Sequence, residues 1–400
     1  TVFYDRAFAQ CKNLTEVSEW TTSLISGSAN YFFYYCTGLK SVPKGNLSFA
    51  TSYIRTYSDS GLQNSINLND CLGGVGVTSY VECFKNTRIT NVSGSISPIS
   101  NGCTVQGMFY GCALMASIVF NIGAVNIQDC SYMFYNCSSL QSPCQISFRS
   151  GGIVDASNFC SYSGVSSLQT NSFVGNISSG TFISLFAYSS LSQVSTNAFN
   201  LSSTSGIDWD NAFYRTRSLL NIDNIRLVGA IHCNSTFEES GVASIPSNFF
   251  VSDECSSYYA CFKSCTNLRT IGTTITPTGN NAQSIIEMFS GCTNLTNMDK
   301  YVFGYSVSNG SILSGLYKTC LYYDRVFYNC SKLMNAPYCE LYNKYGVYLD
   351  LPLPVMFNPF VQNTIDGFPS MDALSYMQCY RNCTGLQEYQ ELHDSYPNWF

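Results

Sequence analysis

Aromatic residues recur along this chain at a nearly constant interval. Successive members of the series are 24 to 27 residues apart over the first twelve positions, and then 38 and 53 residues apart. The series comprises Phe8, Phe33, Tyr57, Phe84, Phe109, Phe134, Phe159, Phe186, Phe213, Phe237, Phe262, Phe289, Phe327 and Tyr380. A repeat of this period indicates a solenoid, in which each unit contacts only its neighbours and the units share one core.

Each aromatic residue begins a short phrase of apolar positions. In the clearest copy Phe8 is followed by Cys11, Leu14 and Val17, whereas shorter copies such as the one at Phe84 lack one residue. Stacked copies can bury these positions together. The Leu-x-x-Ile end predicts a short strand, so the repeats should form a parallel sheet with strands about 4.8 Å apart. The Phe-x-x-Cys part predicts a helical turn or a tight bend on the opposite wall.

A second aromatic theme follows some of the phrases by about half a repeat. Phe173, Phe199, Phe249 and Phe303 belong to it, and we expect them to be additional core residues.

The phrase resembles the BspA-like, or Treponema-type, leucine-rich repeat. Ala7 and Phe8 with Cys11, Leu14 and Val17 follow that family's pattern closely. The resemblance covers about residues 1–340 and returns at Tyr380. It implies a leucine-rich-repeat-like right-handed coil of about 14 repeats, with a parallel sheet on one wall and turns or short helices on the other. It also implies a cell-surface or extracellular protein that adheres to a host, a matrix or neighbouring cells.

The regular spacing ends near the C-terminus. We expect the solenoid to span residues 1–337, and residues 338–400 to hold an irregular insertion rich in Tyr and Pro, the last repeat and a C-terminal cap. A long loop of this kind is often functional, but a cap that seals the last repeat is the simpler interpretation.

Charge is scarce, at 11% of residues, and the net charge is −6. The chain has no basic run, so we expect no nucleic-acid partner. The longest apolar stretch, 113–127, is too short for a membrane span. The chain begins at Thr1 and enters its first repeat at once. We therefore expect that a leader was removed, that a longer protein continues beyond it, or that another subunit covers this end.

The 20 cysteines fall into two sets. Eight occupy the repeat position, where they can be core thiols or can bridge adjacent repeats. The others we expect in variable loops, where disulfides would explain them. The predicted pairs are Cys71 with Cys83, Cys103 with Cys130, Cys233 with Cys255, and Cys320 with Cys339. Zinc is the competing use, but no Cys-x-x-Cys motif is present, so no metal site is expected.

Asn-x-Ser/Thr sequons are frequent, as chance predicts in a chain rich in these residues. Together with the cysteines they favour a secretory route and glycosylation. The candidate sites are Asn13, Asn46, Asn91, Asn176, Asn200, Asn234, Asn294 and Asn309.

Catalytic chemistry finds little support. The two histidines, His232 and His393, are far apart in sequence, and Asp208 and Asp210 lack the further oxygen ligands that a calcium loop needs. We therefore expect neither an enzyme nor a cofactor.

The residues between Leu and Ile in each phrase point to a binding surface. Side chains alternate across a strand, so one of each pair should face outward. Stacking would form a polar ladder suited to a glycan or an extended protein segment, although a merely solvated surface is equally compatible with it. The predicted members are Thr15, Lys40, Gln141, Gln193, Asn221, Arg269 and Asn297.

Two functions remain open. The first is an extracellular, non-enzymatic surface or matrix protein that mediates adhesion or binding to a protein or glycan through its repeat surface. The second is a structural subunit that associates end to end into an extracellular filament or coat, because low charge and end contacts that do not close favour propagation.

Overall fold

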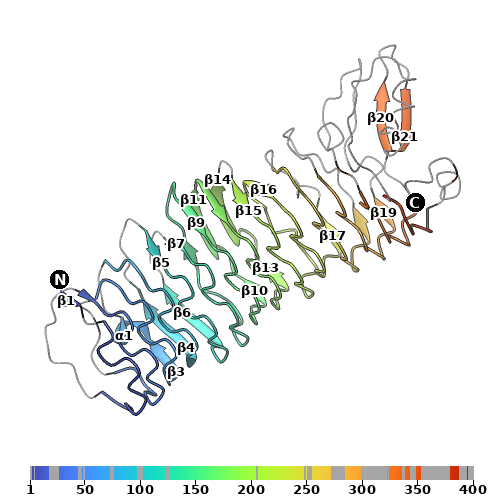
Figure 1. Cartoon of the computed structure of the whole chain (residues 1–400). Coiled ribbons are helices and arrows are strands. Elements are labelled where there is room, and N and C mark those ends of the chain that lie inside the picture. The colour runs from blue at the N-terminus through green and yellow to red at the C-terminus, as the bar shows by residue number, and fades with distance from the viewer. Residues whose placement is uncertain are drawn as a thin grey trace. The chain divides into compact units, whose positions relative to one another are not determined.

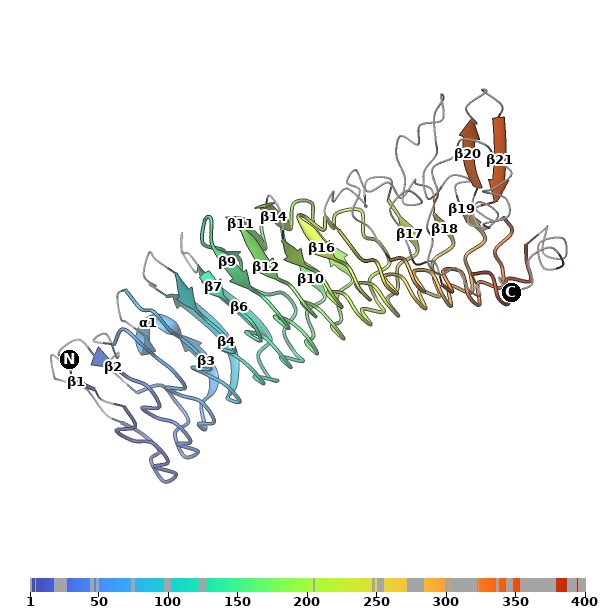
Figure 2. The same ribbon diagram turned by 45° about the horizontal axis from the view of Figure 1, so that its top comes forward.

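The computed structural model describes residues 2–3, 5–17, 27–43, 47, 50–72, 76–96, 102–121, 127–203, 206–246, 249, 255–271, 284–298, 302, 322, 324–335, 338–342, 348–352, 379–386 and 394. The chain divides into two compact units, Thr1–Thr204 and Ser205–Phe400. In each unit successive turns of the chain lie side by side, as Figures 1 and 2 show. This arrangement confirms the predicted solenoid.

The first unit holds the predicted aromatic column. Ring centroids of successive members are 5.3–5.8 Å apart, and their planes lie within 16° of parallel. Offset stacking at this separation is favourable beyond the area that it buries. The stacked members are Phe8, Phe33, Tyr57, Phe84, Phe109 and Phe134.

The second unit repeats this geometry, with centroids 5.1–5.8 Å apart in the column Phe213, Phe237, Phe262, Phe289, Phe327 and Tyr380. Phe327 and Tyr380 stack at 5.7 Å although 53 residues separate them in sequence. The Phe327 N–H also donates to the Cys379 carbonyl at 2.9 Å. Residues 328–379 therefore connect two adjacent turns.

One predicted member of the column is wrong. The Phe134 N–H donates to the carbonyl of Phe159, which places Cys160 at the column position. Asn158 and Tyr162 have positive φ and lie two residues either side of Cys160, as such residues do around the other column members. Phe159 instead occupies the preceding core position and meets Phe134 edge-on, at 80°. A buried thiol thus replaces the ring in this turn.

The wall that carries the aromatic column is built of tight turns. The Cys11 N–H donates to the Phe8 carbonyl at 3.1 Å, and Gln10 between them has a φ of 63°. Left-handed backbone costs a non-glycine residue about 1–2 kcal/mol. Hydrogen bonds to the next turn offset this cost, because the Arg6 N–H donates to Asn30 at 2.9 Å. One short helix, α1 (Leu68–Cys71), lies in the first unit.

Parallel strands lie on three walls, rather than on the single predicted sheet. The strand wall, which follows the leucine of each phrase, has β3 (Gln63–Asn67), β4 (Arg88–Ser95), β6 (Ser117–Asn121), β10 (Ser167–Leu168) and β13 (Gln193–Val194) in the first unit, and β17 (Ser244–Ile245), β18 (Thr270–Ile271) and β19 (Asn297–Met298) in the second.

The second wall, in the first unit, has β8 (Ile146–Ser147), β11 (Phe173–Ile177) and β14 (Phe199–Ser203). The third has β1 (Val2–Phe3), β2 (Gly27–Ser28), β5 (Cys103–Thr104), β7 (Ile127–Asp129), β9 (Ile153–Asp155) and β12 (Ser179–Thr181), with β15 (Ile207–Asp208) and β16 (Ala230–His232) in the second unit. An antiparallel hairpin, β20 (Tyr338–Tyr342) and β21 (Tyr348–Pro352), lies in the predicted insertion.

The number of turns that carry a strand differs from the repeat count. Within the described residues eight turns have one on the strand wall, against the 14 repeats expected. Proline is one physical reason. Pro43 and Pro143 stand at this wall in two turns without a strand, and proline has no N–H to donate to a ladder.

Cysteines form part of the core. The Sγ of Cys137 donates to the carbonyl of Phe109 in the preceding turn at 3.1 Å, and most described cysteines of the repeat position make the same contact. Burial raises the pKa of the Cys112 thiol to about 11. Except for the exposed Cys11, the repeat cysteines therefore pack as small apolar residues, as one of the two predictions stated.

The expectation that the other cysteines lie in variable loops is wrong for the described residues. Cys71, Cys83, Cys103, Cys130, Cys233 and Cys255 are all buried, and all are free thiols. The side chains of Cys233 and Cys255 are within hydrogen-bond reach of each other. Cys320 and the side chain of Cys339 lie outside the described residues. The predicted disulfide pairs thus stay predictions, and core packing already accounts for the described cysteines.

The second aromatic theme also belongs to the core. Phe173 and Phe199 are buried and stack at 5.3 Å with planes 3° apart, and Phe249 is buried against Phe237. Phe303 lies outside the described residues.

In the part of the chain that the structure describes, no helix has the length and apolar character needed to cross a membrane.

Candidate binding surface

The strand wall presents polar side chains outward and apolar side chains inward. In β3, β4 and β6 the inward residues Ile66, Val92 and Ile118 are buried. Outward residues form a hydrogen-bonded ladder across the same strands. The amide nitrogen of Asn91 donates to Ser65 Oγ at 3.1 Å, and Ser117 Oγ donates to Asn91 Oδ1 at 2.7 Å. This alternation is the one that the sequence predicted.

All seven residues proposed for the binding surface are exposed on turns of the coil. Thr15, Lys40, Gln141 and Gln193 lie in the first unit, and Asn221, Arg269 and Asn297 lie in the second. Their exposure agrees with the predicted outward orientation. Their role in binding stays a prediction.

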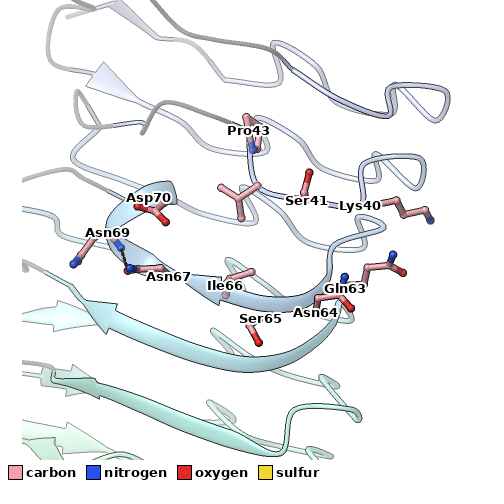
Figure 3. Close-up of a pocket in the computed structure, with 11 residues that line it drawn as sticks. Lys40, Ser41, Pro43, Gln63, Asn64, Ser65, Ile66, Asn67, Asn69 and Asp70 are labelled. Atoms are coloured by element: carbon pink, nitrogen blue, oxygen red, sulfur yellow. Dashed lines mark hydrogen bonds between the residues drawn. The ribbon is translucent and has the colours of Figure 1, made fainter.

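A hollow interrupts the strand wall in the first unit, and Figure 3 shows the side chains around it. Its volume is about 600 Å³, a size that accommodates a small ligand or several sugar rings. The lining residues are Lys40, Ser41, Val42, Pro43, Gln63, Asn64, Ser65, Ile66, Asn67, Asn69 and Asp70.

Local irregularities of the backbone shape this hollow. The register between β3 and β4 shifts at Asn64 and Ser65, and Asn64 has a φ of 68°. The chain then leaves the strand through α1, where Asn67 caps the helix by accepting the Asn69 N–H at 3.0 Å. The preceding turn ends in Pro43, which cannot extend the ladder.

The lining is rich in groups that donate or accept hydrogen bonds. Gln63, Asn64, Asn67 and Asn69 contribute amides, which carry a donor and an acceptor each. Lys40 adds an ammonium group, which also donates to the Thr37 carbonyl at 3.0 Å. Such a site is chemically suited to bind hydroxyl and amide groups, and a lone ammonium can contact an anionic one.

Sequence reasoning found Lys40 but missed the residues of β3 and α1. Tyr57 belongs to the predicted series, but the residues that follow it were not matched to the phrase. The shorter variant seen at Phe84 would have found it, because Leu62 follows Tyr57 by five residues, as Ile89 follows Phe84. The hollow itself depends on the register shift, which no spacing in the sequence indicates.

The sequons differ in accessibility. Asn13, Asn176 and Asn200 are exposed. Asn91, Asn234 and Asn294 are half-buried, and the amide nitrogen of each, the atom that would carry a glycan, donates a hydrogen bond. Asn46 and Asn309 lie outside the described residues.

Among solved structures, this chain is similar to two leucine-rich repeat proteins. A leucine-rich repeat protein from Bacteroides ovatus is 15% identical, with a TM-score of 0.37 and coverage of 83% of this chain and 80% of that one. A leucine rich cell surface protein from Faecalibacterium prausnitzii is 14% identical, with a TM-score of 0.20 and coverage of 74% and 84%. No family model matches the chain, and no curated protein matches it. Both structures are described as leucine-rich repeat proteins, while the fold described above rests on the chain's own hydrogen bonds and ring stacking.

Proposed function

We propose that this chain is a non-enzymatic binding protein of the cell surface or extracellular matrix, and that its strand wall holds a hydroxyl-rich glycan. The polar hollow between Lys40 and Asp70 is the observation that supports this proposal most directly. A solenoid offers an extended surface for such contacts.

The chemistry of the hollow favours a glycan over an apolar ligand. Sugar hydroxyls pair with side-chain amides as both donors and acceptors, and Gln63, Asn64 and Asn69 supply such amides. The exposed side chains of Gln63 and Lys40 lie on the same wall as the hydrogen-bonded ladder of Ser65, Asn91 and Ser117. A glycan chain could therefore continue from the hollow along neighbouring turns.

The test is binding to an array of glycans, followed by calorimetry with the strongest ligand. Gln63→Ala and Lys40→Ala should each weaken binding by about tenfold, the effect of removing one good polar contact. Gln169→Ala is the matched control, because it removes an exposed glutamine of the first unit that belongs neither to the hollow nor to the predicted polar ladder. Unchanged binding in both hollow variants would refute the site, and selective binding of peptides would replace the glycan with a protein partner.

End-to-end assembly is the alternative function. Sedimentation at micromolar concentration distinguishes it, because a binding protein should give one small species whereas a filament subunit should grow with concentration. The extracellular location is supported by the exposed sequons Asn13, Asn176 and Asn200. Glycopeptide mass spectrometry after expression through a eukaryotic secretory pathway tests it.

A further inference from the structure

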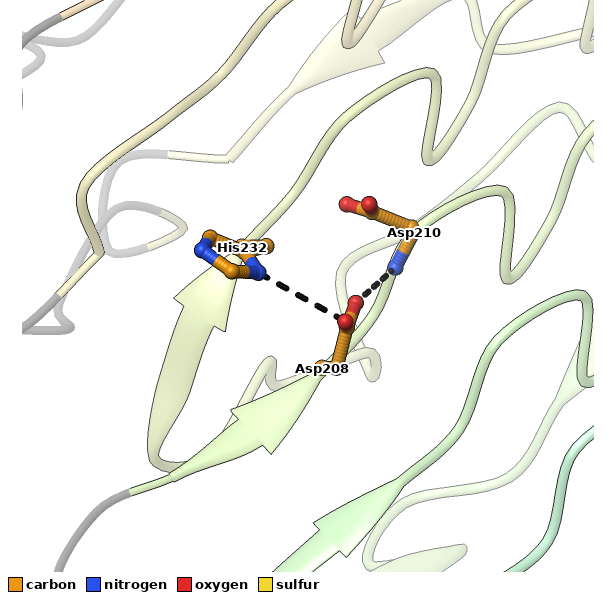
Figure 4. A group of neighbouring side chains, drawn as sticks. All are labelled: Asp208, Asp210 and His232. Carbon is orange, nitrogen blue, oxygen red and sulfur yellow. Dashed lines mark hydrogen bonds and ion pairs between the residues drawn. The ribbon is translucent and has the colours of Figure 1, made fainter.

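We propose that Asp208, Asp210 and His232 form a binding site for a divalent transition-metal ion of the Zn²⁺ class. One ligand atom from each side chain can be chosen so that all three lie within 4.8 Å of one another. Figure 4 shows the two carboxylates and the imidazole facing a common space. The site lies in the second unit, whereas the hollow described above lies in the first.

Stacking of adjacent turns brings these residues together. Asp208 ends β15 and His232 ends β16, and the two residues are paired in the parallel ladder although they are 24 positions apart in sequence. Asp210 follows two residues later, and its N–H donates to Asp208 Oδ1 at 3.0 Å. The sequence alone offered two carboxylates with no further ligand, and the turn geometry supplies the imidazole.

Turn capping explains an aspartate at this place but not an imidazole. The residue equivalent to Asp208 caps the following turn elsewhere with a hydroxyl or a carboxylate: Thr104 accepts the Gln106 N–H at 3.3 Å, and Asp129 accepts the Ser131 N–H at 2.9 Å. His232 has no such capping bond, because the N–H two residues later, that of Asn234, donates to Asp210 Oδ1 at 2.7 Å. Turn capping thus accounts for Asp208 and Asp210, whereas the His232 imidazole caps no turn and faces Asp208 Oδ2 at 3.5 Å.

The separation of the donor atoms suits a metal ion. His232 Nδ1 and Asp208 Oδ2 are 3.5 Å apart, which is long for a hydrogen bond. Two ligands on a tetrahedral zinc, each about 2.1 Å from the ion, lie roughly 3.4 Å apart. The His232 side chain is 42% exposed and that of Asp208 is 23% exposed, so an ion and a completing water can enter from solvent.

The charges of the site favour a cation. The two carboxylates lie close together, and a divalent ion between them would offset their mutual repulsion. An imidazole beside two carboxylates selects zinc, cobalt or nickel over calcium or magnesium, which prefer six or more oxygen ligands.

The experiment uses the full chain after removal of metals by a chelator. Calorimetry with Zn²⁺ should show about one equivalent bound, and Co²⁺ should give visible bands without the thiolate charge-transfer bands that cysteine ligands produce. His232→Ala and Asp208→Asn should each weaken Zn²⁺ binding by tenfold or more, on the order expected for disturbing a metal site. Asp155→Asn is the matched control, because Asp155 lies opposite Asp129 in the first unit without an imidazole.

Circular dichroism must show that each variant keeps the wild-type fold. The proposal is overturned if the wild-type protein binds none of these ions. It is also overturned if the folded His232→Ala variant binds Zn²⁺ as tightly as the wild type, or if Co²⁺ shows thiolate ligation.

Discussion

Replacing neighbouring rings of the aromatic column should reveal that they are energetically coupled. Phe109 is fully buried, with its ring 5.6 Å from Phe84 and 5.8 Å from Phe134. Truncation to alanine removes the ring and leaves a cavity, which costs about 3–5 kcal/mol for a buried phenylalanine. Phe134→Ala should cost a similar amount, because Phe134 is also fully buried and stacks on one side against Phe109.

The double variant separates stacking from simple burial. In Phe109→Ala with Phe134→Ala, the shared ring contact is lost once rather than twice, so the combined cost should fall short of the sum by about 0.5–1.5 kcal/mol. Phe33→Ala with Phe134→Ala is the control, because Tyr57, Phe84 and Phe109 separate the two rings. The destabilisation caused by these two distant substitutions should be additive to within about 0.5 kcal/mol.

Urea unfolding followed by far-ultraviolet circular dichroism gives the free energies. The reasoning fails if the adjacent pair is as additive as the distant pair, since each ring would then be buried independently of its neighbours. It also fails if the single variants cost less than about 1 kcal/mol.

Three further predictions concern the buried thiols and the turns. Burial raises the pKa of Cys112 to about 11 and that of Cys265 to about 12, from an ordinary value of 9.0. The stability that each protonated thiol contributes is therefore complete below pH 9. It is lost as the pH rises toward 11–12, by about 1.4 kcal/mol per thiol per pH unit. Urea unfolding at several pH values measures this loss, and a constant free energy of unfolding up to pH 11 would contradict it. Iodoacetamide should label the exposed Cys11 well before the buried cysteines, and mass spectrometry would show the opposite order if the core were open. The φ of Ser235 is 51°, so Ser235→Gly should stabilise the protein by about 1 kcal/mol. The φ of Gly111 is 70°, so Gly111→Ala should destabilise it by a similar amount. Thermal unfolding measures both changes, and equal signs would refute the turn assignment.

Much of the fold could be predicted because the same residue types recur at fixed positions of each repeat. The spacing from Phe8 to Phe134 fixed the column, and the phrase fixed which positions face inward. Phe159 was misassigned because it directly precedes the column position, which Cys160 occupies in this turn; the hydrogen bond from Phe134 and the positive φ of Asn158 and Tyr162 reveal the register. Most strands on the second and third walls were missed because they span only two or three residues, too few to leave a clear period in sequence, although β11 and β14 span five.

The candidate sites also depend partly on what the sequence determined and partly on what only the tertiary structure decided. Sequence alone determined that this chain is a stacked coil with a polar face and a core of rings and thiols, because identical phrases can bury their apolar positions only against one another. Tertiary structure decided what no local pattern contains. It set the register shift at Asn64 that opens the hollow, and the pairing of Asp208 with His232 across two turns. Both depend on how one turn aligns with the next, and that alignment is set by hydrogen bonds between residues about 25 positions apart.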